Sequence, residues 1–482
     1  MRQHNSRRRF LALGGAAALS CALPRRTWAA QQSNVLVLGA GLAGLHAAAL
    51  LEEQGARVTL LEANNQVGGR VRTALIDGQP FELGASEVGA NYGRLLDSIE
   101  RCGVKLLPKR PRLGDFSFYI GGQLLRKDQW REAAVNRTVG GEREILPHVL
   151  ESALTFKLNP LGDKVGEWLD PRWAALDVSA GSYLLSKGVS AAAVELISSA
   201  TDYTDLWSTS WLAMCRDIAR AQLGGFRGDA NKPQYGGANA AFSLIAGGSQ
   251  RLPEAMAAKL QQSVRFGKIV SHIDCSSTAA EVRCLDGSRF TAGFVVCALP
   301  FSSLKHIAIM PALQGAQAAA VNEAIYAGTT HVILEATAPF WEQDGAGPSM
   351  FTDGPLERIF TIADSHDHLR FLRVWVNGWG ADRLDQLAED ALSKFVITEV
   401  ERMRPAAKGK LKYRMHYSWG KHPYIAGHRH VFLPGQVTRF AREMDQPWQR
   451  IHFAGEHLRR MEFGMESAME TSERAALAVL SS

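Results

Sequence analysis

Residues 34–63 read NVLVLGAGLAGLHAAALLEEQGARVTLLEA, and this stretch decides the fold. Val35 to Leu38 is a short apolar run that predicts a buried strand. Leu42 to Gln54 predicts a helix, and Val58 to Leu61 predicts a second buried strand. A strand, a glycine turn, a helix and a parallel strand in this order predict an α/β fold with a Rossmann-like sheet.

Each part of the glycine turn has a physical role in binding a dinucleotide. Gly39 permits the tight turn, Gly41 lets the backbone approach a pyrophosphate, and Gly44 allows close packing of the helix. The helix N-terminus presents free N–H groups and the positive end of its dipole to the phosphates. Glu62, 18 residues after Gly44, is placed to accept hydrogen bonds from ribose hydroxyls. The neighbouring Ala43 and Ala63 complete this part of the predicted cofactor site.

A second glycine segment follows directly. Gly68-Gly69-Arg70 comes six residues after Glu62, a predicted hairpin turns at Asp77-Gly78, and Glu82-Leu83-Gly84-Ala85 follows. The glycine pair lets the backbone approach the cofactor closely, and Arg70 supplies positive charge near a pyrophosphate.

With these segments the sequence resembles the FAD-dependent amine oxidase family, which includes monoamine, polyamine and L-amino-acid oxidases. The resemblance extends from about Ser33 to Leu480. It is carried further by GGSQRLPEAMA (247–257), VRFGKIVSHI (264–273), FVVCALP (294–300), PFW (339–341) and IHFAGEHLRRMEFGMESAMETSERAA (451–476). It implies FAD as the cofactor.

The resemblance also assigns cofactor contacts outside the first glycine turn. It implies that the backbone of Val270 meets the adenine, and that Gly455 and Glu456 bind the ribityl–pyrophosphate stretch. The helix that begins near Met465 is expected to direct its N-terminus at the flavin ring. Gly69, Arg70, Gly84 and Ala85 complete the set. Gly427 stands where some relatives attach FAD through cysteine, so noncovalent FAD is expected.

The family layout implies two domains made from separated segments. A FAD-binding domain is expected from residues 33–95, 243–310 and 412–482. A substrate domain of the α+β type, with a mixed sheet and covering helices, is expected from residues 96–242 and 311–411.

The sequence departs from the family at the position of a lysine that holds a water against flavin N5. His331 stands there, which removes a fixed positive charge that promotes the reaction of reduced flavin with oxygen. We predict that His331 is an active-site residue. The other interpretation is a strand histidine with a satisfied hydrogen-bond partner.

The predicted substrate pocket also differs from the family pattern. Alignment of the flanking motifs puts His428 and Gly464 where amine oxidases usually place two aromatic side chains. Phe463 directly precedes Gly464 in the sequence. Glu87 stands where relatives that act on amino acids carry an arginine for the carboxylate. Glu87 is predicted to repel a carboxylate and to hold a cation, or else to be a structural acid. His331, His428 and Glu87 are the predicted catalytic residues, and Glu87, His428, Phe463 and Gly464 the predicted substrate residues.

The resemblance implies an activity. A small-molecule amine loses hydride to flavin N5, the imine hydrolyses to an aldehyde or ketone, and O2 or a c-type cytochrome reoxidises the flavin. Two alternatives stay open, namely C–C desaturation of a hydrophobic substrate and a flavoprotein without turnover. No metal site is predicted, because the pairs His366/His368 and His428/His430 lack a third ligand of fitting spacing.

The N-terminus predicts export. Residues 1–29 contain SRRRFLALGGAAALSCALPRR (6–26), with an arginine pair beside Phe10-Leu11 and an apolar run too short to span a membrane. This layout predicts a twin-arginine signal peptide and a periplasmic enzyme that is exported folded around its cofactor. The formal net charge of +6 equals the six arginines before Ala30, so the mature chain is near neutral. Neither nucleic acid binding nor stable membrane insertion is predicted.

Overall fold

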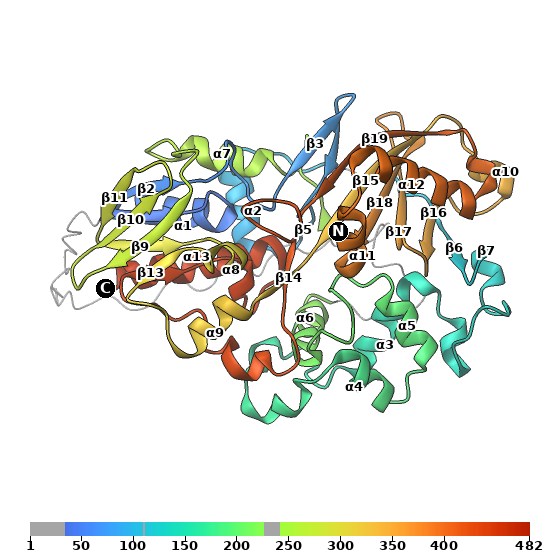
Figure 1. Ribbon diagram of the computed structural model, residues 1–482, viewed down its shortest axis with the longest axis horizontal. Coiled ribbons are helices and arrows are strands. Elements are labelled where there is room, and N and C mark those ends of the chain that lie inside the picture. The colour runs from blue at the N-terminus through green and yellow to red at the C-terminus, as the bar shows by residue number, and fades with distance from the viewer. Residues whose placement is uncertain (1–33, 109–110, 226–241) are drawn as a thin grey trace, which may run out of the picture.

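The computed structural model describes residues 34–108, 111–225 and 242–482. The fold is a mixture of helices and sheets, as predicted, with two principal sheets side by side (Figure 1). Residues 1–29, for which a signal peptide is predicted, lie outside the described residues. Within the described residues no helix has the length and apolar character needed to cross a bilayer.

The first sheet is parallel and has the strand order β2-β1-β12-β21. Its strands are β1 (Asn34–Leu38), β2 (Arg57–Leu61), β12 (Phe294–Cys297) and β21 (Ile451–Phe453). The two predicted strands of the opening stretch are therefore confirmed as β1 and β2, and the predicted helix is α1 (Leu42–Glu53). Three separated parts of the sequence meet in this one sheet, and the cavity described below begins at the carboxyl ends of its strands.

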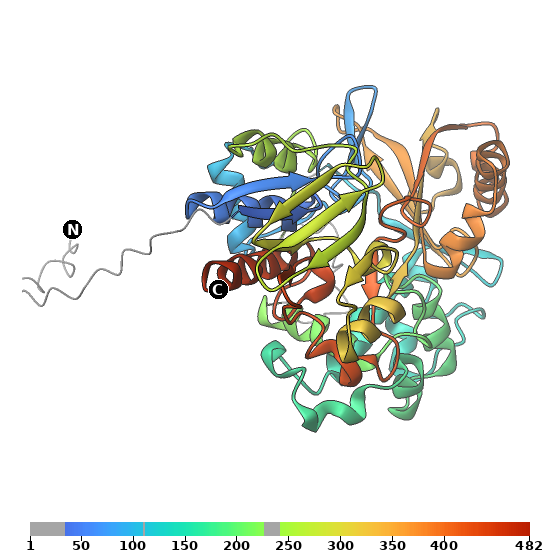
Figure 2. The same ribbon diagram turned by 60° about the vertical axis from the view of Figure 1, so that its left-hand side comes forward.

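Helices cover this sheet. The long C-terminal helix α13 (Gly464–Leu480) packs along α1, with α2 (Gly93–Arg101) and α7 (Arg251–Lys259) beside them. Apolar residues of α1 and α13, including Leu45, Leu51, Met469 and Ala476, are buried in this core. A smaller sheet, whose yellow-green strands lie at the front of Figure 2, has the order β11-β10-β9-β13. Its strands are β9 (Val270–Cys275), β10 (Ala280–Cys284), β11 (Arg289–Ala292) and β13 (Ala308–Met310).

The second principal sheet has seven strands in the order β19-β15-β18-β17-β16-β6-β7. The strands are β6 (Phe116–Ile120), β7 (Gln123–Leu125), β15 (Thr329–Ala336), β16 (Ser349–Thr352), β17 (Arg358–Ala363), β18 (Leu369–Asn377) and β19 (Leu411–Ser418). The expected domain boundary at residue 412 lies inside β19, which pairs with β15. This strand therefore belongs to the seven-stranded sheet, and the sequence placed the boundary several residues too early.

Helices complete this half of the molecule. A group of helices lies below the seven-stranded sheet in Figures 1 and 2, namely α3 (Leu150–Leu158), α4 (Ala180–Ser186), α5 (Ala191–Ser198) and α6 (Trp211–Leu223). The amphipathic helix α12 (Glu389–Met403) packs against β19. Short helices α8 (Phe301–Leu304), α9 (Gly315–Glu323), α10 (Trp341–Asp344) and α11 (Gly378–Asp385) connect the strands.

Three two-stranded ribbons link the halves. The ribbon of β3 (Thr73–Ile76) and β4 (Gln79–Glu82) is the predicted hairpin, and Asp77 and Gly78 both have positive φ at its turn. The others pair β5 (Val88–Gly89) with β8 (Phe242–Ser243) and β14 (Ile325–Ala327) with β20 (Arg429–Val431).

Candidate active site

A cavity of about 1630 Å³ extends from the carboxyl ends of the four-stranded sheet to the near strands of the seven-stranded sheet. Every predicted cofactor, catalytic and substrate residue lines it except Gly44 and Val270. The cavity reaches the surface at Ser365, His366 and Asp367, whose side chains are exposed and also line it. The fold thus joins a dinucleotide-type site and a second chamber in one continuous space.

The first glycine turn is built for close approach. Gly39 has φ of +95°, and a Cβ added at Gly44 would stand 1.9 Å from the carbonyl oxygen of Gly39. Gly44 therefore acts through packing of α1 on the turn, which explains why it does not line the cavity. Helix α1 begins after Gly41, and no side chain caps its first N–H groups. These groups are left for an anion in the cavity.

Glu62 closes this turn. Its carboxylate accepts hydrogen bonds from the backbone N–H of Ala40, at 2.7 Å, and of Asn64, at 2.9 Å. The side chain is thus fixed at the cavity wall, next to Ala63. Val270 begins β9 and does not line the cavity, and its predicted contact with the adenine stays a prediction. The backbone beside Glu62 is that of Arg265, whose carbonyl accepts from the N–H of Glu62 at 2.9 Å.

The second glycine segment lies against the first. A Cβ added at Gly69 would stand 3.4 Å from the Cα of Gly41, so both backbones meet at the cavity wall. Gly84 is equally restricted, because a Cβ there would lie 2.0 Å from the carbonyl oxygen of Arg70. The N–H of Ala85 donates to that same carbonyl at 3.1 Å. Glycine is required at Gly84 because neighbouring backbone occupies the space of a side chain, and it is favoured at Gly69 by a φ of +55°.

A partly buried ion-pair cluster forms part of this wall. Arg70 is 2.9 Å from one carboxylate oxygen of Glu456, and Arg459 is 2.9 Å from the other. Burial on its own would raise the pKa of Glu456, but Arg459 and Arg70 outweigh it and hold that pKa at about 2. Gly455, with φ of +132°, precedes this carboxylate. Arg70 also donates to the carbonyl oxygen of His428 at 3.0 Å. This hydrogen bond connects the end of the cavity near the glycine turns (the nucleotide end) with the end that contains His428 (the substrate end).

Helix α13 points its N-terminus at the same cavity. Phe463, Gly464 and Met465 line the wall, and no side chain caps the first turn of the helix. Glu466 instead points away and accepts from the backbone N–H groups of Arg94 and Leu95, both at 3.0 Å. The helix thereby presents the positive end of its dipole to the cavity, and the contact predicted for Met465 with the flavin stays a prediction.

His331 lies in β15, opposite Trp375 of β18, and its ring centroid is 5.2 Å from that of the indole. It is only 4% exposed, and its Nδ1 has no hydrogen-bond partner among the described residues. Burial first, and then the charge of Arg373, lower its pKa well below the usual value. His331 is therefore neutral and does not replace the charge of a lysine.

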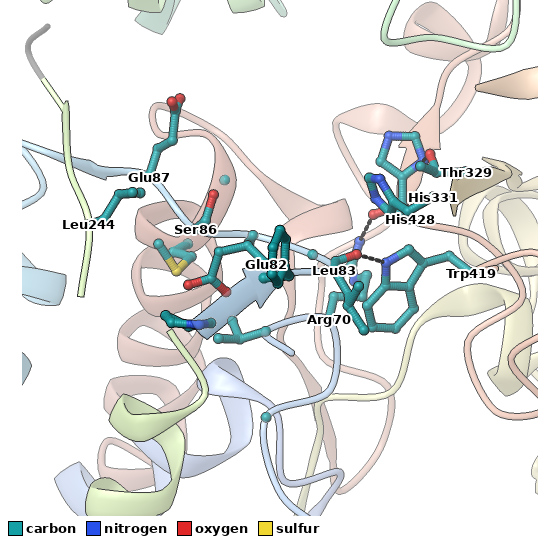
Figure 3. A pocket seen from close by; sticks show the side chains of 18 of the residues that line it. Arg70, Glu82, Leu83, Ser86, Glu87, Leu244, Thr329, His331, Trp419 and His428 are labelled. Carbon is teal, nitrogen blue, oxygen red and sulfur yellow. Dashed lines mark hydrogen bonds between the residues drawn. The ribbon is translucent and has the colours of Figure 1, made fainter. Parts of the chain in front are cut away.

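His428 is close by (Figure 3). Its Nδ1 is 2.5 Å from the hydroxyl oxygen of Thr329 and 2.9 Å from the carbonyl oxygen of Ala327. Burial lowers its pKa to about 4, although the charge of Asp202 acts in the opposite direction. Two neutral imidazoles therefore stand at this end of the cavity.

Glu87 lies on the other side of the labelled group in Figure 3, beyond Glu82 and Ser86. Close to it, Tyr92 forms an edge-to-face pair with Phe463 at 5.9 Å between ring centroids. Burial and then the charge of Glu87 raise the pKa of Tyr92. Glu87 therefore faces a partly aromatic wall, in which an ammonium group is better accommodated than a carboxylate.

Sequence reasoning missed several cavity residues. Asp202, in the loop after α5, forms an ion pair with Arg358 at 2.8 Å. Burial would raise its pKa, but Arg358 keeps it below the usual value. Arg373 and Trp375 of β18 and Trp419 after β19 also line the cavity. Asp202 stands alone in a loop without a motif, whereas the alternation of β18 would have placed Arg373 and Trp375 on one face.

The cavity wall fits FAD. The glycine cradles, the uncapped starts of α1 and α13 and the fixed Glu62 carboxylate match the requirements of an extended dinucleotide. No cysteine lines the cavity in the described part of the chain, and Gly427 has φ of +141° beside Tyr326. These residues hold the cofactor without a covalent bond. In residues 34–108, 111–225 and 242–482 no three histidine, cysteine or acidic side chains are grouped to hold a metal ion.

A parallel sheet with a glycine turn and a substrate chamber under a second sheet defines a class, the dinucleotide-dependent oxidoreductases. Within it, the chain belongs to the family described as flavin containing amine oxidoreductase, whose model matches residues 42–480. It is a flavin-dependent enzyme of the amine oxidase type, and FAD is its cofactor.

Related sequences agree with this assignment. The L-amino-acid oxidase of Siganus canaliculatus is 27% identical over 474 residues, which cover 92% of this chain and 84% of that protein. The flavin-dependent L-tryptophan oxidase RebO of Lentzea aerocolonigenes is 25% identical, with 92% and 98% of the two chains covered.

Solved structures share the fold. Wild-type putrescine oxidase bound to putrescine superimposes with a TM-score of 0.74 and 21% identity, covering 94% of this chain and 99% of its own. The cyclohexylamine oxidase of Brevibacterium oxydans IH-35A gives a TM-score of 0.73 at 20% identity, with 93% and 99% covered.

Proposed function

We propose that this enzyme oxidises the C–N bond of an amine that carries no α-carboxylate. The observation that carries the proposal is the continuous cavity, in which the cofactor cradle opens directly on Glu87, His331 and His428. Bound FAD supplies the oxidising power by taking the α-hydrogen of the substrate with its electron pair. The substrate then leaves as an imine, which water converts to a carbonyl compound and ammonia or a smaller amine.

The charge distribution favours an amine over an amino acid. Glu87 places a carboxylate at the substrate end, where the other acid, Asp202, is already paired with Arg358 at 2.8 Å. The cavity arginines near the cofactor are engaged by acids, since Arg70 and Arg459 contact Glu456 and Arg429 contacts Asp217. A substrate carboxylate would meet like charge at Glu87, while an ammonium group is attracted there as it enters. The names of the relatives do not separate the two classes, because the related sequences are L-amino-acid oxidases and the related structures are amine oxidases, so the proposal rests on the charge of Glu87.

The chain's own residues bind and orient the substrate. Phe463, Tyr92 and Trp375 supply apolar contact area for the substrate body. His428 and His331 are neutral, so they accept or donate hydrogen bonds without placing a cation beside a neutral amine nitrogen. A neutral amine is the reactive form, because its nitrogen lone pair assists departure of the α-hydrogen.

Two further parts of the proposal concern the electrons and the location of the enzyme. The electrons pass either to O2, which takes two electrons and two protons to give hydrogen peroxide, or one at a time to two molecules of an exported c-type cytochrome, with release of the two protons to solvent. The absence of a cation at His331 favours the second route. The twin-arginine layout of residues 1–29 supports a periplasmic enzyme that folds around noncovalent FAD before export.

The test follows flavin absorbance without oxygen. Purified holoenzyme is mixed anaerobically with putrescine, cyclohexylamine, 2-phenylethylamine and L-amino acids, and air or oxidised cytochrome c is then admitted. Bleaching by amines supports the proposed reaction, and the acceptor that restores the colour identifies the electron route. If an apolar substrate with no nitrogen bleaches the flavin and no amine does, the proposal is wrong and C–C desaturation takes its place.

A further inference from the structure

A chain of hydrogen bonds runs from β18 to the cavity through residues that the reaction described above does not use. Thr329 of β15 and Asn377 of β18 are paired in register across the sheet, and both are buried. The amide oxygen of Asn377 accepts from the indole N–H of Trp375 at 2.8 Å and from the hydroxyl of Thr329 at 2.7 Å. That hydroxyl is also 2.5 Å from Nδ1 of His428.

The chemistry of the partners fixes the direction of every bond. An indole N–H only donates, so the oxygen of Asn377 faces Trp375, while its amide nitrogen donates to the carbonyl of Thr201 at 3.1 Å. The Thr329 hydroxyl must therefore donate its hydrogen to Asn377, and its oxygen accepts a hydrogen bond from His428. The carbonyl of Ala327, 2.9 Å from the same Nδ1, also only accepts. Both neighbours of Nδ1 thus require it to carry the hydrogen.

The tautomer of His428 follows. A neutral imidazole carries one hydrogen, so a protonated Nδ1 leaves Nε2 with a lone pair. His428 lines the cavity, next to Thr329 and His331. Because the pKa of His428 is lowered to about 4, the ring stays neutral at physiological pH. It therefore serves as a hydrogen-bond acceptor and not as a general base that takes up a proton.

We propose that Thr329 and Asn377 are positioning residues that hold His428 as the Nδ1–H tautomer, so that Nε2 accepts an N–H bond of the substrate nitrogen. This inference rests on the proposed amine oxidation and deepens it by naming the substrate class. A neutral primary or secondary amine offers an N–H to Nε2, whereas a neutral tertiary amine offers none and leaves a buried acceptor without a partner. The enzyme is therefore selective for primary and secondary amines.

The first test compares substrates that differ only at nitrogen. Cyclohexylamine and 2-phenylethylamine are each tested beside their N-methyl and N,N-dimethyl derivatives, and the rate constant of anaerobic flavin reduction is divided by the dissociation constant. We expect this ratio to fall about tenfold or more at the dimethyl member, as for the loss of one buried hydrogen bond. Equal ratios across a series overturn the inference and leave the proposed function intact. Failure of every amine to bleach the flavin overturns the proposed function, and the inference with it.

Two sets of variants separate hydrogen bonding from steric exclusion. His428→Phe keeps a ring of similar size but has no acceptor, so the discrimination against the dimethyl amine is expected to collapse. Thr329→Val removes the acceptor of Nδ1–H while leaving Ala327, so it should fall between wild type and His428→Phe. Thr329→Ser keeps the hydroxyl and should keep the selectivity. Discrimination that persists in His428→Phe, or is unchanged in Thr329→Val, contradicts the proposal.

Nuclear magnetic resonance determines the tautomer of His428 without enzyme turnover. Holoenzyme labelled with ¹⁵N-histidine distinguishes a protonated ring nitrogen from one with a lone pair by chemical shift, and the His428 signals are those lost in His428→Phe. We expect Nδ1 protonated and Nε2 unprotonated in wild type and Thr329→Ser. A signal from an Nε2–H tautomer in wild type overturns the inference, whatever the activity.

Discussion

The two ends of the cavity are built in different ways. At the nucleotide end the wall is mostly backbone, brought close by Gly39, Gly41, Gly69 and Gly84, and held by short-range hydrogen bonds. At the substrate end the wall is made of side chains such as Glu87, which come from segments far apart in the sequence.

This contrast determines where the enzyme tolerates change. At Gly44 and Gly84 neighbouring backbone already occupies the space of a Cβ, so substitutions there should cost stability and cofactor together. At the substrate end, one side chain should be replaceable by another without loss of the fold or of the cofactor. Four substitutions, from the largest expected effect to the smallest, test this contrast.

Gly44→Ala should have the largest effect. Its Cβ would lie 1.9 Å from the carbonyl oxygen of Gly39, so α1 must move off the turn that receives the phosphates. We expect a loss of about 5 kcal/mol in the free energy of unfolding. The purified protein should lack most of its FAD, as measured by the ratio of flavin to protein absorbance. Gly93→Ala is the control, because nothing lies within 4 Å of its added Cβ; an equal loss in that variant would contradict the account.

Glu456→Gln should be the next most harmful substitution. It leaves the buried guanidinium group of Arg459 and the partly buried one of Arg70 without their carboxylate, at a cost of about 3 kcal/mol in the free energy of unfolding. The pKa of Glu456 lies at about 2 in the folded protein and near 4.5 when unperturbed. The folded state therefore gains stability above pH 4.5 and loses that gain as the pH falls from 4.5 to 2.

Denaturation measured across this pH range gives the readout for Glu456. The gap in stability between wild type and Glu456→Gln should be widest above pH 4.5 and should narrow toward pH 2. A gap that stays constant with pH would show that the carboxylate charge is not what stabilises this wall.

Glu87→Gln should change substrate binding and leave the cofactor in place. Removal of the negative charge is expected to weaken amine binding about tenfold, or about 1.4 kcal/mol. The dissociation constant is measured by anaerobic flavin reduction, with flavin content as the check on the fold. Glu342→Gln, at an exposed position in α10, is the matched control. Loss of FAD in Glu87→Gln would show that Glu87 supports the cofactor, and this would contradict the contrast between the two ends of the cavity.

His331→Lys should have the smallest effect. Burial and the charge of Arg373 lower the pKa of a lysine here as they lower that of His331, so reoxidation by O2 should become about threefold faster at the pH values where the lysine is protonated, because reduced flavin transfers charge to oxygen more readily beside a positive group. Stopped-flow mixing of reduced enzyme with oxygenated buffer measures the rate constant. An increase in the rate of flavin reduction, without a change in reoxidation, would contradict the role assigned to this position.

The nucleotide end could be predicted closely from the sequence, because its elements are local. The strands at Val35 and Val58, the helix from Leu42 and the hairpin at Asp77-Gly78 follow from short patterns, and the structure confirms them. Val270 lies at the start of β9 outside the cavity lining, because a family motif gives the strand but not the residue whose backbone turns toward the cavity.

The substrate end could be predicted only in part. Glu87, His331 and His428 were found because they replace residues at marked positions of family motifs, and all three line the cavity. Asp202 and the pair of Thr329 with Asn377 were not found, since their roles arise from the register of β15 with β18 and from a loop that folds back over them. No short-range pattern encodes such contacts.

The most direct test of the central claim uses pairs of compounds that differ by one carboxylate. Putrescine with L-ornithine, 2-phenylethylamine with L-phenylalanine, and tryptamine with L-tryptophan are each added anaerobically to the holoenzyme while flavin absorbance is recorded. The account predicts that the amine of at least one pair bleaches the flavin and that its amino acid does so at least about tenfold more slowly, because Glu87 faces the carboxylate. Faster bleaching by the amino acids would contradict it.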